Sequence, residues 1–482
     1  MLLLLLTIFI PIIFGAVLLI APKKISYNTL CQYTGAVLLV SILLIVLSLL
    51  KINSDAPFNV FAFNESLLIA FKLDSVGKLF ALVMGVVWVC VGFFSFEYMK
   101  HEKNHQRYFG VYLMVLGILM GLCFAGNLTT YYAFYEFMTI GSFAMVLHNQ
   151  SREAIMAGLK YLFYSFAGAY MVLFGFYFVH QYAADKTMAF SMGGILESNN
   201  EKVILISLLL MILGFSVKAG MFPMHGWLPT AHPVAPAPAS AALSAIIVKS
   251  GVLGIIRVIF YIFGADIFVG SYVQKVVLIL SLITVFMGSM LAYKEKVLKK
   301  RLAYSTVSQV SYILFGIFVI NDTAFNGALI HVGAHAAIKS TLFLCAGAII
   351  YITGCTRVSE LKGIGKKMPI MLWCYTIVSL GLIGIPPFGG FASKWYLGIG
   401  ALDSNIPVFS WLGPVVLLIS ALLTAGYLLP ITIDGFLPGK DFEENEATKK
   451  AHEPNAMMLI PIIILTTLSV IIGVFPEVMI WG

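Results

Sequence analysis

The chain has 482 residues, of which 60% are hydrophobic and only 11% are charged, and its formal net charge is +8. The charged share is less than half the usual one of about 25%, which excludes a soluble enzyme, a disordered tail and a nucleic-acid binder. The excess of 30 basic over 22 acidic residues is sparse, and we interpret it as loop charge that orients the chain in a bilayer.

The apolar segments are long enough to cross a membrane many times. A bilayer core of about 30 Å requires about 20 apolar residues per helix. By this measure we expect an all-α polytopic membrane protein with about fourteen spans. The first begins MLLLLLTIFIPII without a basic segment or cleavage site, so we expect a retained helix and not a signal peptide. The expected spans are 2–21, 28–50, 73–98, 108–125, 127–148, 154–182, 202–222, 238–263, 273–293, 300–320, 323–352, 369–400, 410–436 and 456–480.

Basic residues fall mainly on one side of these spans. One alternating set of loops and flanks holds 18 of the 30, the opposite set holds five, and seven lie within spans. The positive-inside rule therefore places the first set in the cytoplasm and both termini outside, in a multi-pass protein of the inner (cytoplasmic) membrane. The basic set includes 22–27, 99–107, 149–153, 294–299 with its flank to 301, 353–368 and 437–455.

The cysteines do not indicate a cofactor. All six lie far apart without a C-x-x-C pair, which argues against zinc and iron–sulfur sites, so we interpret them as buried packing residues. They are Cys31, Cys90, Cys123, Cys345, Cys355 and Cys374.

Glu136 is the one acidic residue placed in the middle of a span, within NLTTYYAFYEFMTIGSFAMVL. A charge at the centre of a membrane helix costs at least about 2.5–3.5 kcal/mol, so it requires a reason. A carboxyl there is neutral when alone and charged beside a cation, and a proton relay requires this responsiveness. The alternative is a neutral glutamic acid that is hydrogen-bonded between helices.

Four lysines are candidate partners and relay groups, because a buried lysine readily accepts and releases a proton. Lys78 and Lys160 lie near span ends, where we expect them to reach the interface. Arg257 remains charged at accessible pH, which favours a structural role. The four candidates are Lys218, Lys249, Lys339 and Lys394.

Two histidines precede Lys339 on the eleventh span. His331, His335 and Lys339 follow one another at intervals of four residues, which places them on one helix face. We interpret this face as a polar track. The alternatives are hydrogen-bonded packing histidines and a two-histidine metal site, for which the sequence offers no third ligand.

Two spans are interrupted. Pro223, Pro229, Pro233, Pro236 and Pro238 follow Lys218, and GLIGIPPFGGFASKWYL carries a second break before Lys394. Irregular backbone at membrane depth persists only where protein or water satisfies it, so such breaks usually line a cavity. A simple kink or a re-entrant loop is the alternative. Because Lys218 lies about 15 residues into its apolar run, it reaches mid-membrane only if the helix starts well outside or resumes after the break.

The breaks lie in the seventh and twelfth spans, five apart. Five is odd, so two tandem five-helix units face opposite ways across the bilayer, a pattern that indicates an inverted repeat with its site at the repeat interface. We therefore expect an N-terminal part, two repeats of spans 4–8 and 9–13, and a last helix. The boundaries are 1–107, 108–263, 273–436 and 456–482.

The motifs around these residues resemble a known family. Glu136 in its tyrosine-rich helix, VKAGMFPMHGWLPTAHPVAPAPASA, HVGAHAAIKSTLF and GIPPFGGFASKWYL are similar to the antiporter-like membrane subunits of respiratory complex I, membrane-bound hydrogenases and Mrp-type cation/proton antiporters. The resemblance covers roughly residues 70–435. It implies two inverted repeats, each with a half-channel, joined by a polar axis along the middle of the membrane.

The resemblance also implies a role for each matching residue. Glu136 resembles the carboxylate that pairs with Lys218, and Lys249 resembles the relay towards the second half. His331, His335 and Lys339 resemble the connecting region, and Lys394 the terminal charged group. The long lateral helix of the distal complex I subunit has no counterpart after the last span, which argues against that identity.

We therefore expect a proton-translocating subunit of a complex I-related oxidoreductase. Electron transfer in partners would drive it, since the chain shows no redox, nucleotide or metal motif and no catalytic chemistry of its own. No cofactor is expected in this chain. The expected partners are other membrane subunits, peripheral redox subunits and the lipid bilayer.

Two alternatives remain. The first is a subunit of an Mrp-type antiporter that is driven by an ion gradient. The second is an enzyme acting on lipid-linked substrates, and the acidic cluster 441–450 argues against it because it is typical of a solvated loop.

Overall fold

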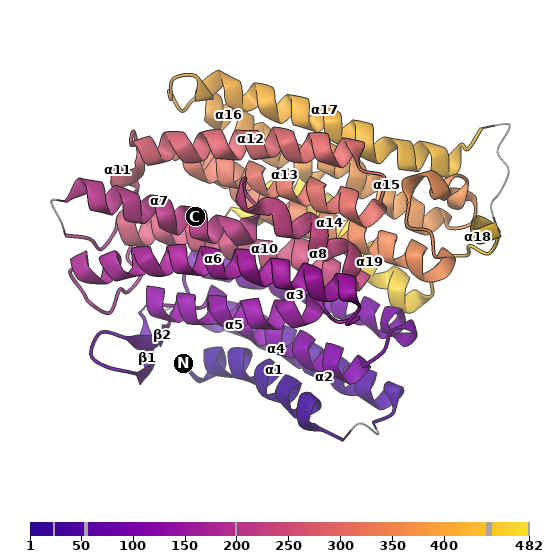
Figure 1. Cartoon of the computed structure of the whole chain (residues 1–482), viewed down its shortest axis with the longest axis horizontal. Coiled ribbons are helices and arrows are strands. Elements are labelled where there is room, and N and C mark those ends of the chain that lie inside the picture. Colours follow the sequence, from indigo (N-terminus) through magenta and orange to yellow (C-terminus); the bar gives the residue numbers. More distant parts are fainter. Residues whose placement is uncertain (23–24, 53–55, 198–199, 440–445, 481–482) are drawn as a thin grey trace.

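The computed structural model describes residues 1–22, 25–52, 56–197, 200–439 and 446–480. In these residues, twelve helices are long and apolar enough to cross a membrane, or thirteen if the bent pair Val358–Lys366 and Pro369–Ile383 forms one span. The long helices run side by side along one axis (Figure 1). The chain is therefore an all-α polytopic membrane protein, as expected.

The N-terminal part contains three long helices and a small hairpin. The two strands pair antiparallel, with Phe58 opposite Phe71 and Ala62 opposite Leu68. This hairpin was not predicted from the sequence. The elements are α1 (Leu2–Ile20), α2 (Tyr27–Lys51), β1 (Phe58–Ala62), β2 (Leu68–Phe71) and α3 (Ser75–Tyr98).

The next stretch contains the first interrupted span. The helix is interrupted after α7 and resumes as the 3₁₀ turn η2 and α8. The next span is continuous and consists of α9, the π-helical segment η3, α10 and the π-helical segment η4. The elements are α4 (His105–Cys123), α5 (Leu128–Val146), α6 (Arg152–Tyr182), α7 (Glu201–Ala219), η2 (Met224–Trp227), α8 (Leu228–Val234), α9 (Ala237–Ala242), η3 (Leu243–Ile247), α10 (Val248–Ile256) and η4 (Arg257–Phe263).

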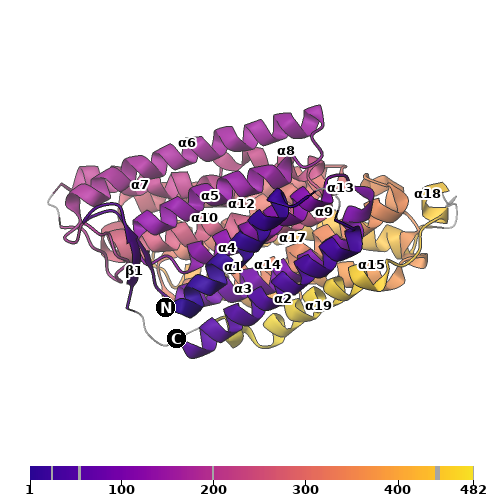
Figure 2. The ribbon, with the colours of Figure 1, turned by 90° about the horizontal axis from the view of Figure 1, so that it is seen from below.

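The last stretch contains the second interrupted span, which is divided between α15 and α16. The final long helix, α19, packs against α3 and α14, so it closes the bundle against the N-terminal part (Figure 2). The elements are α11 (Ala265–Phe268), α12 (Tyr272–Lys294), α13 (Leu298–Val319), α14 (Asp322–Thr353), α15 (Pro369–Ile383), α16 (Gly389–Leu402), α17 (Phe409–Phe436), α18 (Glu446–Lys449) and α19 (Ala456–Val474).

The number of spans differs from the expected fourteen at two places. The expected span 127–148 is α5, a 19-residue helix made more polar by its tyrosines, threonines and Glu136. The expected span 369–400 is the pair α15 and α16, of 15 and 14 residues. Lys23, Lys24 and Lys440, which entered the orientation argument, lie outside the described residues, as do residues 441–445 of the acidic cluster.

Glycines allow several helices to approach closely. A Cβ atom on Gly117 of α4 would lie 2.3 Å from the carbonyl oxygen of Ile8 in α1. Gly168 of α6 and Gly214 of α7 face each other, and a Cβ on either would lie within 2.7 Å of the other's carbonyl oxygen. Small residues at such crossings let backbones pack directly, which is the usual basis of helix association in lipid. The interior of the bundle is thus protein and not lipid.

Candidate functional site

Glu136 lies on α5, and the N-terminal end of this helix is held by the hairpin. The Asn127 side chain accepts a hydrogen bond from the N–H of Thr130 at 2.9 Å and donates one to the carbonyl of Leu68 at 3.0 Å. The Thr130 hydroxyl accepts from the N–H of Ala70 at 2.8 Å. These bonds cap the first turn of α5 and fix it to β2. They therefore set the position of Glu136 along the helix axis.

Lys218 is fully buried and is held by hydroxyl groups of α6. Its ammonium donates to the Tyr161 hydroxyl and to the Ser165 hydroxyl, the latter at 2.9 Å, and lies 4.1 Å from the centroid of the Tyr161 ring. The Tyr161 hydroxyl shares a further hydrogen bond of 2.5 Å with Ser142 on α5. A cation over an aromatic face gains electrostatic stabilisation without a counterion. These neutral groups therefore contribute to the stabilisation of a charged lysine at this position.

Glu136 and Lys218 were expected to form a carboxylate–lysine pair. Among the described residues, however, the two are not paired within the 4.0 Å limit of an ion pair. The Oε1 atom of Glu136 is buried without a hydrogen-bond partner in the described chain. Buried groups of this kind are usually satisfied by ordered water. The expected pairing is thus not seen as a direct contact among the described residues, and it stays a prediction.

The first break begins one residue after Lys218. Gly220 takes a left-handed conformation (φ 74°), which ends α7 at Ala219, and the indole N–H of Trp227 donates to the carbonyl of Val217 at 2.7 Å. This bond satisfies one of the carbonyls that a helix end leaves free. The helix resumes as η2 and α8, which is one of the two conditions set for Lys218 in the sequence analysis. The lysine therefore lies at a helix C-terminus, where the helix dipole favours a cation.

Lys249 connects the two halves of the chain. Its ammonium lies 2.5 Å from Nδ1 of His335, which lies on α14. When Lys249 is protonated, its ammonium can only donate, so Nδ1 then accepts and the proton of the neutral ring lies on Nε2. That Nε2 is buried without a partner in the described part of the chain. The structure thus joins Lys249 directly to one of the two histidines expected to form a track.

The α10 helix also lies directly against α7 at Lys218. A Cβ atom added to Gly251 would lie 2.4 Å from the carbonyl oxygen of Phe215 and 3.1 Å from Cβ of Lys218. Only glycine permits this approach, because any other residue would clash with the α7 backbone. Lys218 and Lys249 are therefore on adjoining helices, without a direct hydrogen bond between them among the described contacts.

His331 leads from His335 to the second break. The two imidazole centroids are 5.9 Å apart, and Nδ1 of His331 is 2.8 Å from the hydroxyl of Ser393 on α16. Lys394, the next residue, donates to the carbonyls of Leu382 at 2.5 Å and Ile383 at 2.9 Å, at the end of α15. Both interrupted spans thus hold a lysine near the carbonyl end of their first segment. His331 brings the track within one residue of the second lysine.

Lys339 does not continue this row. Its ammonium donates to the carbonyl of Leu302 in α13 at 3.1 Å. His232 of α8 is fully buried with both ring nitrogens unpartnered among the described residues. The expected three-residue track is therefore two histidines directed to the second break and a lysine directed to another helix.

Arg257 has the structural role expected for it. Its guanidinium binds both carboxylate oxygens of Asp74, one of them at 2.8 Å, and the side chains are only 1% and 8% exposed. Asp74 also caps α3 by accepting from the N–H of Gly77 at 2.9 Å. Lys160 is exposed and Lys78 partly exposed, positions from which long side chains reach the interface.

Sequence reasoning did not identify the hydroxyl and aromatic partners of these charges. Tyr161 and Ser165 bind Lys218, Ser393 binds His331, and the ring of Tyr312 lies 5.7 Å from His331 and 5.1 Å from the Lys394 ammonium. The position of Ser393 directly before Lys394 was an available signal. The described residues contain no cluster of three or more metal-ligating side chains.

Comparison with known proteins identifies similar sequences. A family profile described as "NADH:quinone oxidoreductase/Mrp antiporter, TM" matches residues 125–424, and one described as "NADH-Ubiquinone oxidoreductase (complex I), chain 5 N-terminus" matches residues 62–109. NADH-quinone oxidoreductase subunit N of Desulforudis audaxviator is 32% identical over 78% of this chain and 76% of that protein. A Na(+)/H(+) antiporter subunit of Alkalihalophilus pseudofirmus is 28% identical over 98% of this chain and 94% of that protein.

Solved structures share the fold. A chain of the Mrp complex from Dietzia sp. DQ12-45-1b matches with a TM-score of 0.85 at 20% identity, over 98% of this chain and 94% of that chain. A chain of respiratory complex I from Thermus thermophilus matches with a TM-score of 0.83 at 21% identity, over 99% and 96%. A chain of the archaeal membrane-bound sulfane sulfur reductase matches with a TM-score of 0.83 at 23% identity, over 98% and 94%.

Proposed function

Because the chain belongs to the NADH:quinone oxidoreductase/Mrp antiporter family of membrane subunits, we propose that it translocates protons as part of a complex I-related membrane oxidoreductase. In this proposal electron transfer in partner subunits supplies the energy, and other membrane subunits surround the chain. Protons are the proposed ion, with sodium ions as the alternative cargo. The chain itself is proposed to hold no cofactor.

One observation supports this proposal most strongly. Basic groups lie in a row from α7 to α16, from the buried Lys218 through the buried Lys249, His335 and His331 to the partly buried Lys394. Ionisable groups inside a membrane protein are costly, and such groups usually mark a path for ions or protons. Ionisable groups with a purely structural role need only a partner of opposite charge, as Asp74 and Arg257 have in each other. A row of basic groups with few acidic partners is instead suited to passing a proton from one group to the next.

The proposed switch is the coupling between Glu136 and Lys218. A charged Glu136 favours the proton on Lys218. When Glu136 is neutral, the hydroxyls of Tyr161 and Ser165, the rings of Tyr135 and Tyr161 and the C-terminal end of α7 remain. The proton then leaves Lys218 for Lys249 on the adjoining helix through bridging water, since the two amines share no direct bond. A change of charge at Glu136 therefore releases a proton from Lys218.

The relay continues over contacts that the structure provides. Lys249 donates its proton to Nδ1 of His335, and the ring gives up the proton on Nε2 towards His331. After this transfer the neutral ring of His335 carries its proton on Nδ1, so it must return to the Nε2–H tautomer before Nδ1 can accept the next proton from Lys249. His331 exchanges a proton with the Ser393 hydroxyl, beside Lys394. In the proposed inverted-repeat arrangement, residues 108–263 hold the first half of this path and residues 273–436 the second.

The switch has a suitable magnitude. Two unit charges 4 Å apart at an effective dielectric of about 20 interact by about 4 kcal/mol, and at about 8 Å by about 2 kcal/mol. Moving one charge against 100 mV requires about 2.3 kcal/mol. A carboxylate–lysine coupling of this size is therefore comparable with the work of transport.

The direct test is ion pumping in inside-out membrane vesicles with a pH-sensitive dye. Glu136→Gln and Lys218→Ala should each remove most of the pumping while the chain still inserts and assembles. Lys78→Ala is the matched control, because it removes a lysine from an apolar helix outside the proposed path. Normal pumping in either of the first two variants would contradict the relay.

A second candidate function is a subunit of an Mrp-type Na⁺/H⁺ antiporter. The nearly full-length match to the antiporter protein of Alkalihalophilus pseudofirmus favours it. In that case a gradient and not electron transfer drives exchange through the same residues. Purifying the complex from its native membrane distinguishes the two, since co-migrating dehydrogenase or hydrogenase subunits support the oxidoreductase and small antiporter subunits support the antiporter.

A further inference from the structure

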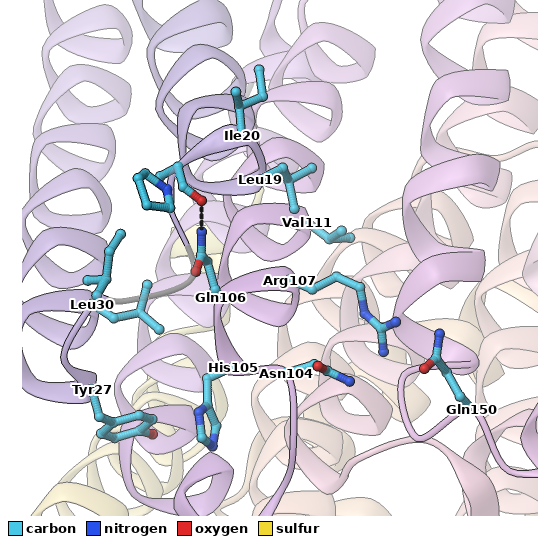
Figure 3. Close-up of a pocket in the computed structure, with 13 residues that line it drawn as sticks. Leu19, Ile20, Tyr27, Leu30, Asn104, His105, Gln106, Arg107, Val111 and Gln150 are labelled. Carbon is cyan, nitrogen blue, oxygen red and sulfur yellow. Dashed lines mark hydrogen bonds between the residues drawn. The ribbon is translucent and has the colours of Figure 1, made fainter.

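A large cavity lies far from the proposed proton path, where the ends of α1, α2 and α4 meet (Figure 3). Its volume is about 1150 Å³. One part of its wall is apolar and includes Leu19, Ile20, Leu30 and Val111, and the other includes Arg107. Leu19 and Ile20 are 42% and 85% exposed. The cavity therefore presents a cation beside an apolar surface that is open to the surroundings of the bundle.

The charge of Arg107 is not balanced by a carboxylate. Its guanidinium donates to the backbone carbonyl of His148 at 2.5 Å, and it has no acidic partner within ion-pair distance in the described part of the chain. The described residues that line the cavity include no aspartate or glutamate. Figure 3 shows the guanidinium beside the cavity, towards Gln150. Four of its five N–H donors have no other partner among the described residues, so an anion can bind there.

The neighbouring polar side chains shape the cavity without neutralising this charge. The Gln106 amide donates to the carbonyls of Leu18 at 2.6 Å and Ala21 at 2.8 Å, which ties the end of α1 to the start of α4. The Nε2 atom of His105 is buried without a partner among the described residues. The wall is therefore held in place independently of any ligand, and the charge remains available.

We propose that this cavity binds the headgroup of an anionic phospholipid, with the phosphate on Arg107 and an acyl chain along Leu19 and Val111. The cavity lies at the basic end of the bundle, beside the loops 99–107 and 149–153 that the sequence places in the cytoplasm. At that end arginine meets lipid phosphates, and its planar guanidinium binds them with two parallel hydrogen bonds. Val111 lies one helical turn beyond Arg107, towards the apolar core. A lipid thus satisfies both parts of the wall at once.

The test measures thermal unfolding of the full chain, purified in a zwitterionic detergent, against added short-chain phosphatidylglycerol or phosphatidylcholine. Phosphatidylglycerol should raise the unfolding temperature of the wild type more than phosphatidylcholine. Arg107→Gln should raise the concentration for half-maximal stabilisation about tenfold, as expected for loss of a charged hydrogen-bonding partner. Arg152→Gln is the matched control, because Arg152 is exposed on the same side and lies outside the cavity.

A second variant guards against misfolding of the first. Gln150→Glu adds a negative charge at an exposed position of the lining and should weaken phosphatidylglycerol binding in a normally folded chain. Equal stabilisation by both lipids, or an unchanged response in Arg107→Gln and Gln150→Glu, would overturn the proposal. So would equal stabilisation by inorganic phosphate alone. Loss of a co-purifying subunit in Arg107→Gln, with an unchanged lipid response, would reassign the cavity to a protein interface.

Discussion

The Asp74–Arg257 pair offers a sharp test of how charge is accommodated in this bundle. Asp74→Asn removes the negative charge and retains a side chain that can still cap α3, because asparagine caps helices about as well as aspartate. Asp74→Ala removes both functions. Arg257 is 1% exposed, so either substitution leaves a guanidinium that cannot reach water. The two variants therefore separate the charge pair from the cap.

The expected magnitudes follow from that burial. Removing one partner of a buried ion pair typically costs about 3–5 kcal/mol, and losing an N-cap costs about 1 kcal/mol more. Asp74→Asn should therefore lose most of the stability that Asp74→Ala loses. The double variant Asp74→Asn with Arg257→Met removes the stranded charge and should be more stable than Asp74→Asn alone, since contacting residues are not additive.

The pH dependence of the same pair has a definite sign. Burial alone would raise the pKa of Asp74, but the charge and hydrogen bonds of Arg257, with the N–H of Gly77, outweigh burial and hold this pKa below its usual value. A lowered pKa in the folded chain stabilises it above the unfolded pKa of about 3.9 and loses that effect in acid. The deficit of Asp74→Asn should thus be constant from about pH 6 to about pH 8 and shrink only towards strongly acid pH.

The assay is the free energy of unfolding in lipid–detergent micelles that are titrated with sodium dodecyl sulfate. The wild type, the three variants and a surface control, Lys100→Gln, are compared at two pH values. A decrease of less than about 1 kcal/mol in the free energy of unfolding of Asp74→Asn would refute the argument, because a buried guanidinium without a counterion should destabilise the fold by more than that. A double variant less stable than Asp74→Asn would refute it as well.

Three further predictions concern the proposed path. Gly251→Ala places a methyl group 2.4 Å from a backbone oxygen of α7, so we expect the free energy of unfolding to decrease by about 1–3 kcal/mol and pumping to be slower. Full pumping activity would contradict this, because it would show that α7 and α10 move apart freely. His335→Ala removes the group that accepts from Lys249 and should stop pumping. His335→Gln should not pump either, because glutamine cannot carry a ring proton. Pumping by the glutamine variant would contradict proton transfer through the ring. Lys394→Ala should impair pumping more than Lys78→Ala in the same vesicles, and equal effects would argue against the assigned path.

The sequence predicted the features whose signal lies in a single segment. A charge within an apolar run is visible without a structure, which is why Glu136, Lys218, Lys249 and Lys394 were identified as candidates. The two breaks were equally visible, because proline and glycine interrupt a helix wherever it packs. The resemblance added roles to these positions. Those roles remain predictions until pumping is measured.

Partners that are distant in the chain could not be predicted in the same way. Tyr161 binds Lys218 across 57 residues, and Asp74 binds Arg257 across 183. Neutral hydroxyls such as those of Tyr161 and Ser393 occur throughout the apolar segments, so composition does not distinguish the ones that bind a charge. The hairpin was missed because segment 52–72 is too polar for a span and too short to show a clear strand pattern.

The π-helical segment η3, which ends two residues before Lys249, holds one surplus residue within the span. A π turn accommodates one more residue than an α turn, so the surplus is absorbed locally and the following helix keeps its facing. A one-residue deletion in the regular α-helix after η3 and before Lys249 has no such turn to absorb it, and it would turn Lys249 by about 100° away from His335. The span thus tolerates a change of length within η3 better than in the helix that carries Lys249.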